Sequence, residues 1–593
     1  MSTLKPYFRM VGVITATLLA ATLISAADRV EIVGRIDART TITPINRVLT
    51  PAGRQIELPE TRPQVAALSP DNAILVTSGL HFLFVIDPAT GNVIQRVPLP
   101  LAGKSEISDI VSEEILKPDT TARASYTGLT FSPDGSRLFL SAVNGSVKAF
   151  SVGKDHKVTG RGSFPLPDAK APRRDNEIPA GLAVSRDGKR LYVAGNLSNR
   201  LFELDAQSGK VLRTFNVGAL PYGIVLIGNK AYVSNWGGRR PDAQSVTGPA
   251  GRGTTVRVDP IRFIANEGSV SVVDLTSGKV KEIMVGVHSS ALTATPNGRY
   301  VCVANAGSDT ISVIDVRKDE VIETISLRWH ANDIFGASPN ALSFDSRGNT
   351  LYVCNGSQNA VAAVAFRPGK SKLLGLIPTG WFPGAIVHDG KRSALYVANI
   401  KGTLPSNQAK YNSHDYVGTL SLISVPGKKE LAEHTKVVLR NYRDTVMQEA
   451  LQPARPNRPA LPVPERVGEP SVFKHVVYLI KENRTYDQVL GDVKAGNGNA
   501  ELCTFGEKVT PNQHKMVHDF VLLDNTYCSG ILSADGHQWT DTAFATDYME
   551  KSFAGFPRSY THGMTEDGVD AMVYSPGGFI WDNALAHGKT FRD

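Results

Sequence analysis

The feature that most constrains the fold is a hydrophobic strand pattern that recurs along most of the chain before residue 440. Its form is Leu-Tyr-Val-(Ala/Ser/Cys)-Asn, and most copies follow a Pro/Gly turn such as Ser132–Gly135. A second strand ending near Asp and then a third strand follow most copies. The copies are Leu191–Ala194, Ala231–Asn235, Val301–Asn305, Leu351–Asn355 and Leu395–Asn399, with weaker ones at Ile74–Thr77 and Leu138–Ser141.

This repetition predicts a β-propeller. Three or four short strands at a period of about 40 to 50 residues are what one propeller blade requires. One blade cannot bury both of its faces, so the blades must stack and close into a ring. The seven copies predict a mainly β fold, with a seven-bladed propeller over residues 40–440.

The Tyr-Val-Ser-Asn and Tyr-Val-Ala-Asn copies resemble the YVTN family of β-propeller repeats. The resemblance covers most of residues 40–440 and implies the ring-shaped fold. It implies little about function, because propellers serve as binding, enzymatic and scaffolding domains.

Two insertions interrupt the repeat. Residues 237–267 carry Arg239, Arg240, Arg252 and Arg257, and the interpretation we favour is a solvated insertion, with an anion-contacting lid as the alternative. His330 lies in the other insertion, where no neighbour in sequence completes a metal-ligand set. We expect it to be a polar surface residue.

The N-terminus predicts export. Lys5 and Arg9 precede a nearly apolar stretch, and Ser25-Ala26-Ala27 offers small residues for cleavage, so residues 1–27 form a predicted signal peptide. An uncleaved anchor is the alternative, and no later segment is long and apolar enough for a second span. The mature chain is expected to be periplasmic or extracellular, without a stable membrane span.

Charge and cysteine content narrow the classes of partner. A net charge of +8 over 593 residues is mild, so no nucleic-acid partner is expected. Four cysteines exclude a scaffold held by disulfides. Cys503 and Cys528 could pair, whereas Cys302 and Cys354 lie in strand-like runs and are expected in the core.

A boundary follows the repeats. Residues 452–470 contain six prolines and predict a semi-rigid extended linker. Beyond it, His475–Ile480 is an apolar run typical of a strand buried on both faces of a parallel sheet. Glu482 and Asn483 follow directly, at the carboxyl end of that strand, where α/β sheets collect ligand groups. A carboxylate and an amide oxygen suit a divalent cation, although such residues are more often a solvated loop.

A second cluster follows another predicted strand, Phe520–Leu523. Ser533, Asp535 and His537 precede a helix-like stretch at residues 542–549. A serine beside a helix start lies near free N–H groups that stabilise an alkoxide and a phosphate oxyanion. The competing interpretation is an ordinary N-cap serine, with Asp535 and His537 on the surface.

His475–Asp487, with Glu-Asn-Arg-Thr-Tyr-Asp after the strand, resembles the bacterial phosphoesterase family of phospholipase C and acid phosphatase enzymes, related to the alkaline phosphatase superfamily. Thr510–His514 and Asp524–Ser529 resemble the same family's second block. The resemblance implies metal-dependent hydrolysis of a phosphate ester, with Glu482, Asn483 and Ser533 as ligands of a Mn, Zn or Ca ion. Ser533 most nearly matches the nucleophile, and Asp535 and His537 the groups around the phosphate.

The resemblance covers only residues 471–593, which we expect to be the N-terminal portion of an α/β phosphoesterase domain. Residues 579–587 predict a helix ending at Gly588, and the chain stops as another strand should begin. Two functions remain open. One is an exported phosphoesterase whose propeller binds a substrate, a cell-envelope component or a protein. The alternative is a non-catalytic propeller binding protein that carries a truncated phosphoesterase remnant.

Overall fold

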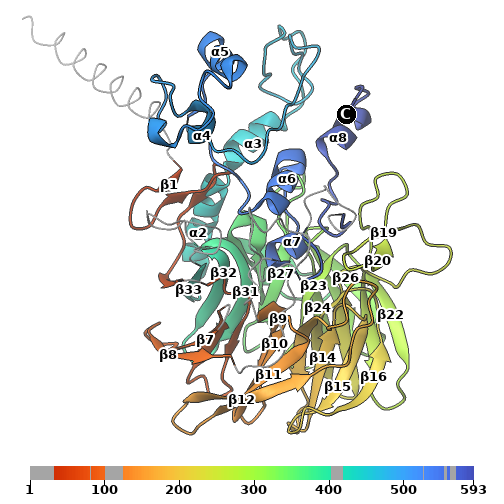
Figure 1. Cartoon of the computed structure of the whole chain (residues 1–593). Coiled ribbons are helices and arrows are strands. Elements are labelled where there is room, and N and C mark those ends of the chain that lie inside the picture. Colours follow the sequence, from red (N-terminus) through yellow and green to blue (C-terminus); the bar gives the residue numbers. More distant parts are fainter. Residues whose placement is uncertain are drawn as a thin grey trace, which may run out of the picture.

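The computed structural model describes residues 33–59, 61–79, 82–99, 124–402, 418–524, 526–552, 557–560 and 569–593. The predicted signal peptide lies outside these residues. Most of the described strands form seven antiparallel four-stranded sheets, which we number as blades one to seven (Figure 1). The innermost strands β5, β9, β13, β17, β23, β27 and β31 contact one another in a closed circle, which confirms the predicted seven-bladed propeller.

The blades follow one another in chain order. Their strands are, for blade one, β5 Ala66–Leu68, β6 Leu75–Ser78, β7 Phe82–Ile86 and β8 Val93–Pro98; for blade two, β9 Ala124–Phe131, β10 Arg137–Ala142, β11 Ser146–Val152 and β12 Val158–Pro165; for blade three, β13 Pro179–Val184, β14 Arg190–Gly195, β15 Arg200–Asp205 and β16 Val211–Asn216; for blade four, β17 Pro221–Ile227, β18 Lys230–Asn235, β21 Gly268–Asp274 and β22 Val280–Val285; for blade five, β23 Ser289–Ala294, β24 Tyr300–Asn305, β25 Thr310–Asp315 and β26 Glu320–Ser326; for blade six, β27 Pro339–Phe344, β28 Thr350–Asn355, β29 Ala360–Ala365 and β30 Lys372–Pro378; and for blade seven, β31 Trp381–Asp389, β32 Ala394–Gly402, β33 Gly418–Ser424 and β4 Arg54–Leu58.

The repeated motif forms the second strand of each blade, and its asparagine has a structural role. Asn399 is fully buried and donates its side-chain amide to the hydroxyls of Thr419 and Ser421, each at 2.9 Å. Asn235 and Asn305 make the same kind of contact with hydroxyls on the next strand. A buried amide needs such partners, so the Asn of the repeat pins neighbouring strands together.

The ring is closed by a strand from the beginning of the propeller. β4 pairs antiparallel with β33, with Leu58 opposite Gly418 and Ile56 opposite Leu420. The first and last segments of the propeller therefore share blade seven. This pairing leaves the ring without an open gap between its first and last blades.

We expect Leu58→Ala to open this closure. Leu58 is fully buried between blades seven and one, so truncation should lower the free energy of unfolding by about 2 to 5 kcal/mol. Ile94→Ala on the outer strand β8 is the matched control, because Ile94 is 56% exposed and should cost less than about 1 kcal/mol. Thermal unfolding followed by circular dichroism measures both, and equal losses would contradict this role of β4.

Smaller elements surround the ring. A three-stranded sheet precedes β4, the hairpin β19–β20 projects from blade four, and helices follow blade seven (Figure 1). Their bounds are β1 Gly34–Arg35, β2 Thr41–Ile42, β3 Val48–Leu49, β19 Thr247–Pro249, β20 Thr255–Arg257, α2 Lys428–Asn441, α3 Asp444–Ala450, α4 Tyr486–Leu490, α5 Pro511–Asp519, α6 Ser533–Thr542, α7 Asp547–Lys551 and α8 Ile580–Ala586, with short 3₁₀ turns η1 Gly356–Gln358 and η2 Ala500–Leu502.

The α/β domain predicted for residues 471–593 does not form a sheet in this structure. The described residues after Ser424 contain helices and irregular segments, and the predicted strands at 475–480 and 520–523 are wrong. Val477 is 91% exposed and Phe520 81% exposed. A strand buried on both faces needs neighbours that supply hydrogen bonds and apolar cover, and no described strand pairs with either segment.

Three further expectations need correction. The proline-rich segment 452–470 folds back on itself instead of extending, because Arg455 pairs with Glu465 and Glu469. The helix expected over residues 542–549 is broken at Ala543, whose φ of 54° is left-handed, and α7 begins only after Thr546. The helix expected before Gly588 is confirmed as α8.

Candidate active site over the propeller face

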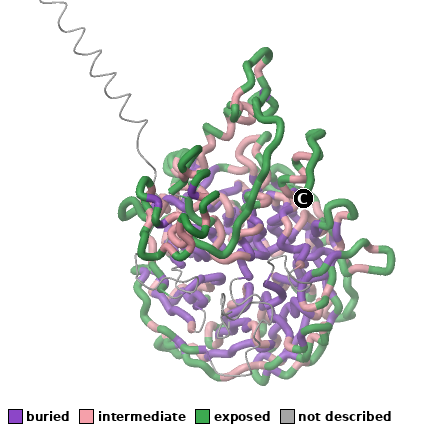
Figure 2. Tube along the Cα trace, turned by 45° about the horizontal axis from the view of Figure 1, so that its top comes forward, coloured by how far each residue is buried: buried purple, intermediate pink, exposed green. Residues whose placement is uncertain are grey.

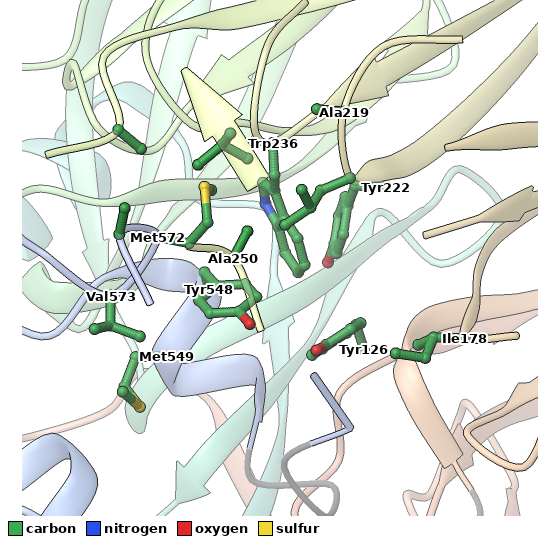
Figure 3. Packing of buried hydrophobic residues seen from close by; sticks show 14 of the residues in the cluster. Tyr126, Ile178, Ala219, Tyr222, Trp236, Ala250, Tyr548, Met549, Met572 and Val573 are labelled. Atoms are coloured by element: carbon green, nitrogen blue, oxygen red, sulfur yellow. The ribbon is translucent and has the colours of Figure 1, made fainter. Parts of the chain in front are cut away.

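The C-terminal segment covers one face of the propeller, and α7 lies at its centre (Figure 1). All five residues of α7 are buried. Figure 3 shows Tyr548 of this helix near Tyr126 and Trp236 of the blades, with Met549 beside Val573. The ring centroids of Tyr548 and Trp236 are 5.4 Å apart in an edge-to-face arrangement. The segment therefore shares one hydrophobic core with the ring.

Buried polar contacts fix α7 to three blades. The Lys551 ammonium donates to the Tyr222 hydroxyl at 2.7 Å, and Ser290 donates to Asp547 Oδ2 at 2.7 Å. Lys401 Nζ lies 2.6 Å from Glu550 Oε1. Each buried charge thus has a partner on the other side of the contact, as charges removed from water require.

The arginine-rich insertion 237–267 takes part in the same contact. Arg558 of the C-terminal segment donates to the carbonyls of Ala250 at 2.8 Å and Asn196 at 2.9 Å. Arg252 donates to the carbonyl of Pro557, and Arg257 pairs with Asp242. The expectation of a solvated insertion holds for Arg239 and Arg240, which are exposed, but is wrong for Ala250 and Arg252, which contact the C-terminal segment.

The C-terminal segment has an exposed part, which includes residues 476–480, and a buried part, which includes α7. Figure 2 shows a largely exposed extension rising from a buried base against the propeller. The candidate site residues lie between the two, since Ser533 and His537 are half-buried and Asn483 is exposed. Solvent can reach these residues, while the buried contacts of α7 and Arg558 hold the segment that carries them against the propeller.

Helix α6 begins at Ser533, so this serine lies at a helix start, although the helix expected nearby covered residues 542–549. Asp535 accepts the N–H groups of Ile531 and Leu532, both at 2.9 Å. Burial raises the pKa of Asp535, while the nearby Lys401 charge and these two N–H groups oppose the rise. Asp535 therefore caps the start of α6 and ties the two residues before Ser533 to the first turn of the helix.

His537 lies one helical turn after Ser533, so both side chains lie on the same face of α6. His537 Nε2 is 3.6 Å from Glu482 Oε2, although these residues are far apart in sequence. The Nε2 atom is buried and, among the residues that the structure describes, has no hydrogen-bond partner. The structure thus brings Glu482 close to His537, one helical turn along α6 from Ser533.

Two neighbours complete this cluster. Asn483 follows Glu482 with a left-handed φ of 63°, a conformation that asparagine tolerates and that turns the chain sharply after the carboxylate. Burial raises the pKa of Tyr560 to about 12, while the adjacent Ser533 side chain acts against this rise. The Tyr560 hydroxyl therefore stays protonated near neutral pH and can donate a hydrogen bond beside Ser533.

A titratable pair, His514 and Asp492, joins α5 to the segment that follows α4. His514 of α5 lies 2.8 Å from the Asp492 carboxylate through Nε2, and its Nδ1 contacts the Thr510 carbonyl at 2.9 Å. Burial lowers the pKa of His514, but these two contacts outweigh it, so the pKa is raised above the ordinary value. The hydrogen bond from His514 lowers the pKa of Asp492 to about 2.

The stability of α5 should therefore depend on pH. A raised histidine pKa stabilises the fold fully below the ordinary pKa of about 6.5 and loses this effect as pH rises through the folded value. We expect hydrogen exchange of the α5 amides, corrected for intrinsic rate, to accelerate from pH 6 to pH 9. Asp492→Asn should abolish the pH dependence, and the exposed Asp519→Asn, the control, should retain it. A pH-independent wild type would contradict this assignment.

His330 has partners that the sequence did not reveal. Asp333 and Asp444 bring ligand-type atoms within 4.8 Å of the imidazole, and Asp444 comes from α3. The Asp333 oxygens accept the backbone N–H of His330 and the Gln448 side-chain amide, both at 2.8 Å. This set is a hydrogen-bond network that ties α3 to the insertion. Local spacing could not have found it, because α3 follows blade seven.

The four cysteines are free and fall into two groups by burial. Cys503 and Cys528 are free, so the disulfide considered for them does not form in this structure. Cys302 and Cys354 are fully buried in the blades, as expected. No helix among the described residues has the length and apolar character needed to cross a membrane.

Comparison with known proteins gives one family match. The family model described as "Lactonase, 7-bladed beta-propeller" matches residues 255–379. The curated relatives include WD repeat-containing protein 90 from Homo sapiens, 28% identical over 267 residues, which are 44% of this chain and 12% of the relative. The Xenopus tropicalis protein of the same name is 28% identical over 316 residues, 49% of this chain and 15% of the relative. The matches thus span a small part of these relatives.

Solved structures resemble the chain at low identity. Kuenenia stuttgartiensis hydrazine synthase has a TM-score of 0.42 and 17% identity, covering 57% of this chain and 93% of that chain. The structure of U3-55K has a TM-score of 0.44 and 10% identity, covering 62% and 98%. The fold assignment rests on the closed circle of seven sheets and on the family match. The chain is a seven-bladed β-propeller protein, similar over residues 255–379 to the lactonase-type propellers.

Proposed function

We propose that the protein hydrolyses phosphate esters at the cluster of Glu482, Ser533 and His537. The observation that carries the proposal is the 3.6 Å approach of Glu482 to His537 on the helix that begins with Ser533. A carboxylate and an imidazole thus meet one helical turn from a half-buried hydroxyl at a helix start. This is the constellation that phosphoryl transfer to a serine requires.

The resemblance to phosphoesterases implies a divalent metal, and the side chains present fit one. Glu482 forms no ion pair with Lys or Arg in the described chain, and the facing His537 Nε2 atom has no hydrogen bond. The Glu482 Oε2 and His537 Nε2 atoms, 3.6 Å apart, are both of a kind that binds divalent cations. Glu482 and His537 would hold the ion, with Asn483 and Ser533 beside them.

The chain's own groups account for the steps at phosphorus. Ser533 Oγ bonds to phosphorus as the bond to the leaving alcohol breaks, and the serine proton ends on that alcohol. The N-terminus of α6 and the protonated Tyr560 hydroxyl stabilise the negative charge on the phosphoryl oxygens. Asp535 keeps Ser533 in position, and water then releases phosphate. A bound metal would supply further charge neutralisation and a lower serine pKa.

The propeller supports this site in the proposal. α7 and Arg558 anchor the segment that carries α6 to the ring, so the ring acts as the rigid base on which the site stands. Binding of a cell-envelope component or another protein by the remaining propeller surface, and export through residues 1–27, remain part of the proposal.

The test is hydrolysis of 4-nitrophenyl phosphate and bis(4-nitrophenyl) phosphate by the full chain. We expect chelation by EDTA to abolish activity and added Mn, Zn or Ca to restore it. Glu482→Gln should reduce the rate by about 10²-fold or more, because the carboxylate charge is lost. Glu501→Gln, an exposed carboxylate on η2, should leave the rate unchanged. Equal effects of the two variants, or activity that survives chelation, would contradict the proposal.

A non-catalytic binding role is the second candidate. The specific observation in its favour is the exposure of the apolar run 475–480, where the resemblance implies a buried strand. Absence of turnover on both substrates with every metal, in a chain that unfolds cooperatively, would favour this role over the enzyme.

A further inference from the structure

A cavity of about 730 Å³ opens beneath the start of α2, between blades six and seven. Its walls come from the turn between β27 and β28, the turn between β31 and β32, and residues 425–432. These turns lie at the opposite ends of the inner strands from Ser290 and Gly384, which contact α7. The cavity is therefore separate from the Ser533 cluster, and its volume falls within the range of small-molecule sites.

The cavity lies where the last blade ends, because the residues that follow blade seven form one of its walls. After blade seven the chain turns into α2, which packs along β30, the outer strand of blade six. Thr435 Oγ1 accepts the Leu376 N–H at 2.9 Å, so the helix satisfies a backbone donor on that edge strand. Gly375 leaves room for this approach, since an added Cβ would lie 2.7 Å from Leu431 Cγ. Other blades have no such helix on their outer strand among the described elements.

The inner wall is apolar and aromatic. Leu374, Ala363 and Leu431 line it together with the rings of Tyr352 and His388. These two rings are stacked, with centroids 5.9 Å apart and planes 9° apart. Burial lowers the pKa of His388, so the imidazole is neutral near pH 7 and the wall carries no positive charge of its own. Such a wall suits a flat or aliphatic group.

The mouth of the cavity carries cations. Arg347 and Lys428 line it, are exposed, and form no ion pair within the described chain. The one carboxylate among the lining residues is Asp345, and its Oδ1 accepts the Asn349 N–H at 2.8 Å. Two cations against one carboxylate, over an apolar wall, favour an anion with an apolar body.

We propose that this cavity binds a small organic acid, with its anionic group at Arg347 and Lys428 and its apolar body against Tyr352 and Leu374. Arg347 can donate two parallel hydrogen bonds to a carboxylate, and Lys428 adds a point charge. The site is independent of any hydrolysis at Ser533, because it lies on the other face of the ring and shares no residue with that cluster.

The probe is 2-naphthoate, an aromatic carboxylate, titrated into the full chain by isothermal calorimetry beside its neutral amide. We expect saturable binding of 2-naphthoate at one site, and about tenfold weaker binding of the amide, the loss expected for one charge-assisted hydrogen bond. The double variant Arg347→Ala/Lys428→Ala should lose at least about tenfold in affinity. Leu374→Trp, which fills the cavity from a half-exposed position on β30, should abolish binding.

The matched control is Arg186→Ala/Lys189→Ala, which removes two exposed cations from the corresponding turn of blade three. It should leave the affinity unchanged. The proposal is overturned if 2-naphthoate does not bind, if the amide binds equally well, or if the control weakens binding as much as Arg347→Ala/Lys428→Ala. Loss of binding to Leu374→Trp with an unchanged melting temperature supports it, because the blades are then intact.

Discussion

Lys401→Met is expected to destabilise the protein by about 3 to 5 kcal/mol at pH 8, the cost of leaving one partner of a buried ion pair uncompensated. The Lys401 side chain is 0% and the Glu550 side chain 1% exposed, and their charged atoms lie 2.6 Å apart. Without Lys401, the Glu550 carboxylate is left near the buried Asp535 carboxylate and has lost its ion-pair partner. It must then take up a proton or move out of its buried position. Urea unfolding of the full chain measures the loss.

The matched control is Lys436→Met on α2. Lys436 pairs with Glu433 at 2.9 Å, but both side chains are well exposed, at 70% and 61%. Removing one partner of an exposed pair should change stability by less than about 1 kcal/mol. The double variant Lys401→Met/Glu550→Leu should recover most of the loss, because two apolar side chains replace the pair. A large loss in the control, or none in Lys401→Met, would contradict the anchoring of α7.

The pH dependence gives a second readout of the same pair. Burial raises the pKa of Glu550 to about 7, even with Lys401 opposing the rise. The folded state therefore binds more protons than the unfolded state between about pH 4.5 and pH 7, so stability falls as pH rises through this window. Lys401→Met raises the Glu550 pKa further. Its destabilisation should thus be smaller at pH 5 than at pH 8, and the opposite order would contradict the assignment.

Ser533→Ala should reduce hydrolysis of 4-nitrophenyl phosphate by at least about 10³-fold, because no other hydroxyl on α6 stands at the helix start beside Tyr560. Ser529→Ala is the control, since Ser529 precedes the helix and belongs to neither the cap nor the cluster. Ser533→Thr should keep part of the activity by retaining a hydroxyl. All three should unfold as the wild type does, which separates chemistry from folding.

A covalent intermediate tests the role of Ser533 directly. Acid quenching during turnover should trap a phosphate on Ser533, detected by mass spectrometry of the peptide containing residues 531–542. The Ser529→Ala protein should trap the same phosphopeptide, and Ser533→Ala should not. Retained activity in Ser533→Ala, or a phosphate on a different residue, would show that the nucleophile is assigned incorrectly.

Comparison of sequence and structure shows where local patterns suffice. The strand copies such as Leu351–Asn355 became the second strands of the blades, because alternation and turn residues act within a few positions. The start of α6 at Ser533 did not follow from such a signal, which placed the helix at residues 542–549. The apolar runs at 475–480 and 520–523 failed, because a buried strand depends on neighbours that no local pattern supplies.

Long-range contacts had no local signal. Neither the contact of Arg558 with the insertion nor the approach of His537 to Glu482 follows from spacing in sequence. The cavity under α2 likewise has no local signal, because residues of blade six, blade seven and the segment 425–432 line it together.

The amino-acid sequence by itself determined the blades and their number, since short-range hydrogen bonds, turn geometry and hydrophobic periodicity act on neighbouring residues. The tertiary structure alone decided that the C-terminal segment is built onto the propeller face, that β4 closes the ring with β33, and which side chains meet there. These outcomes depend on packing between segments hundreds of residues apart, where burial and charge pairing are decided by the whole fold.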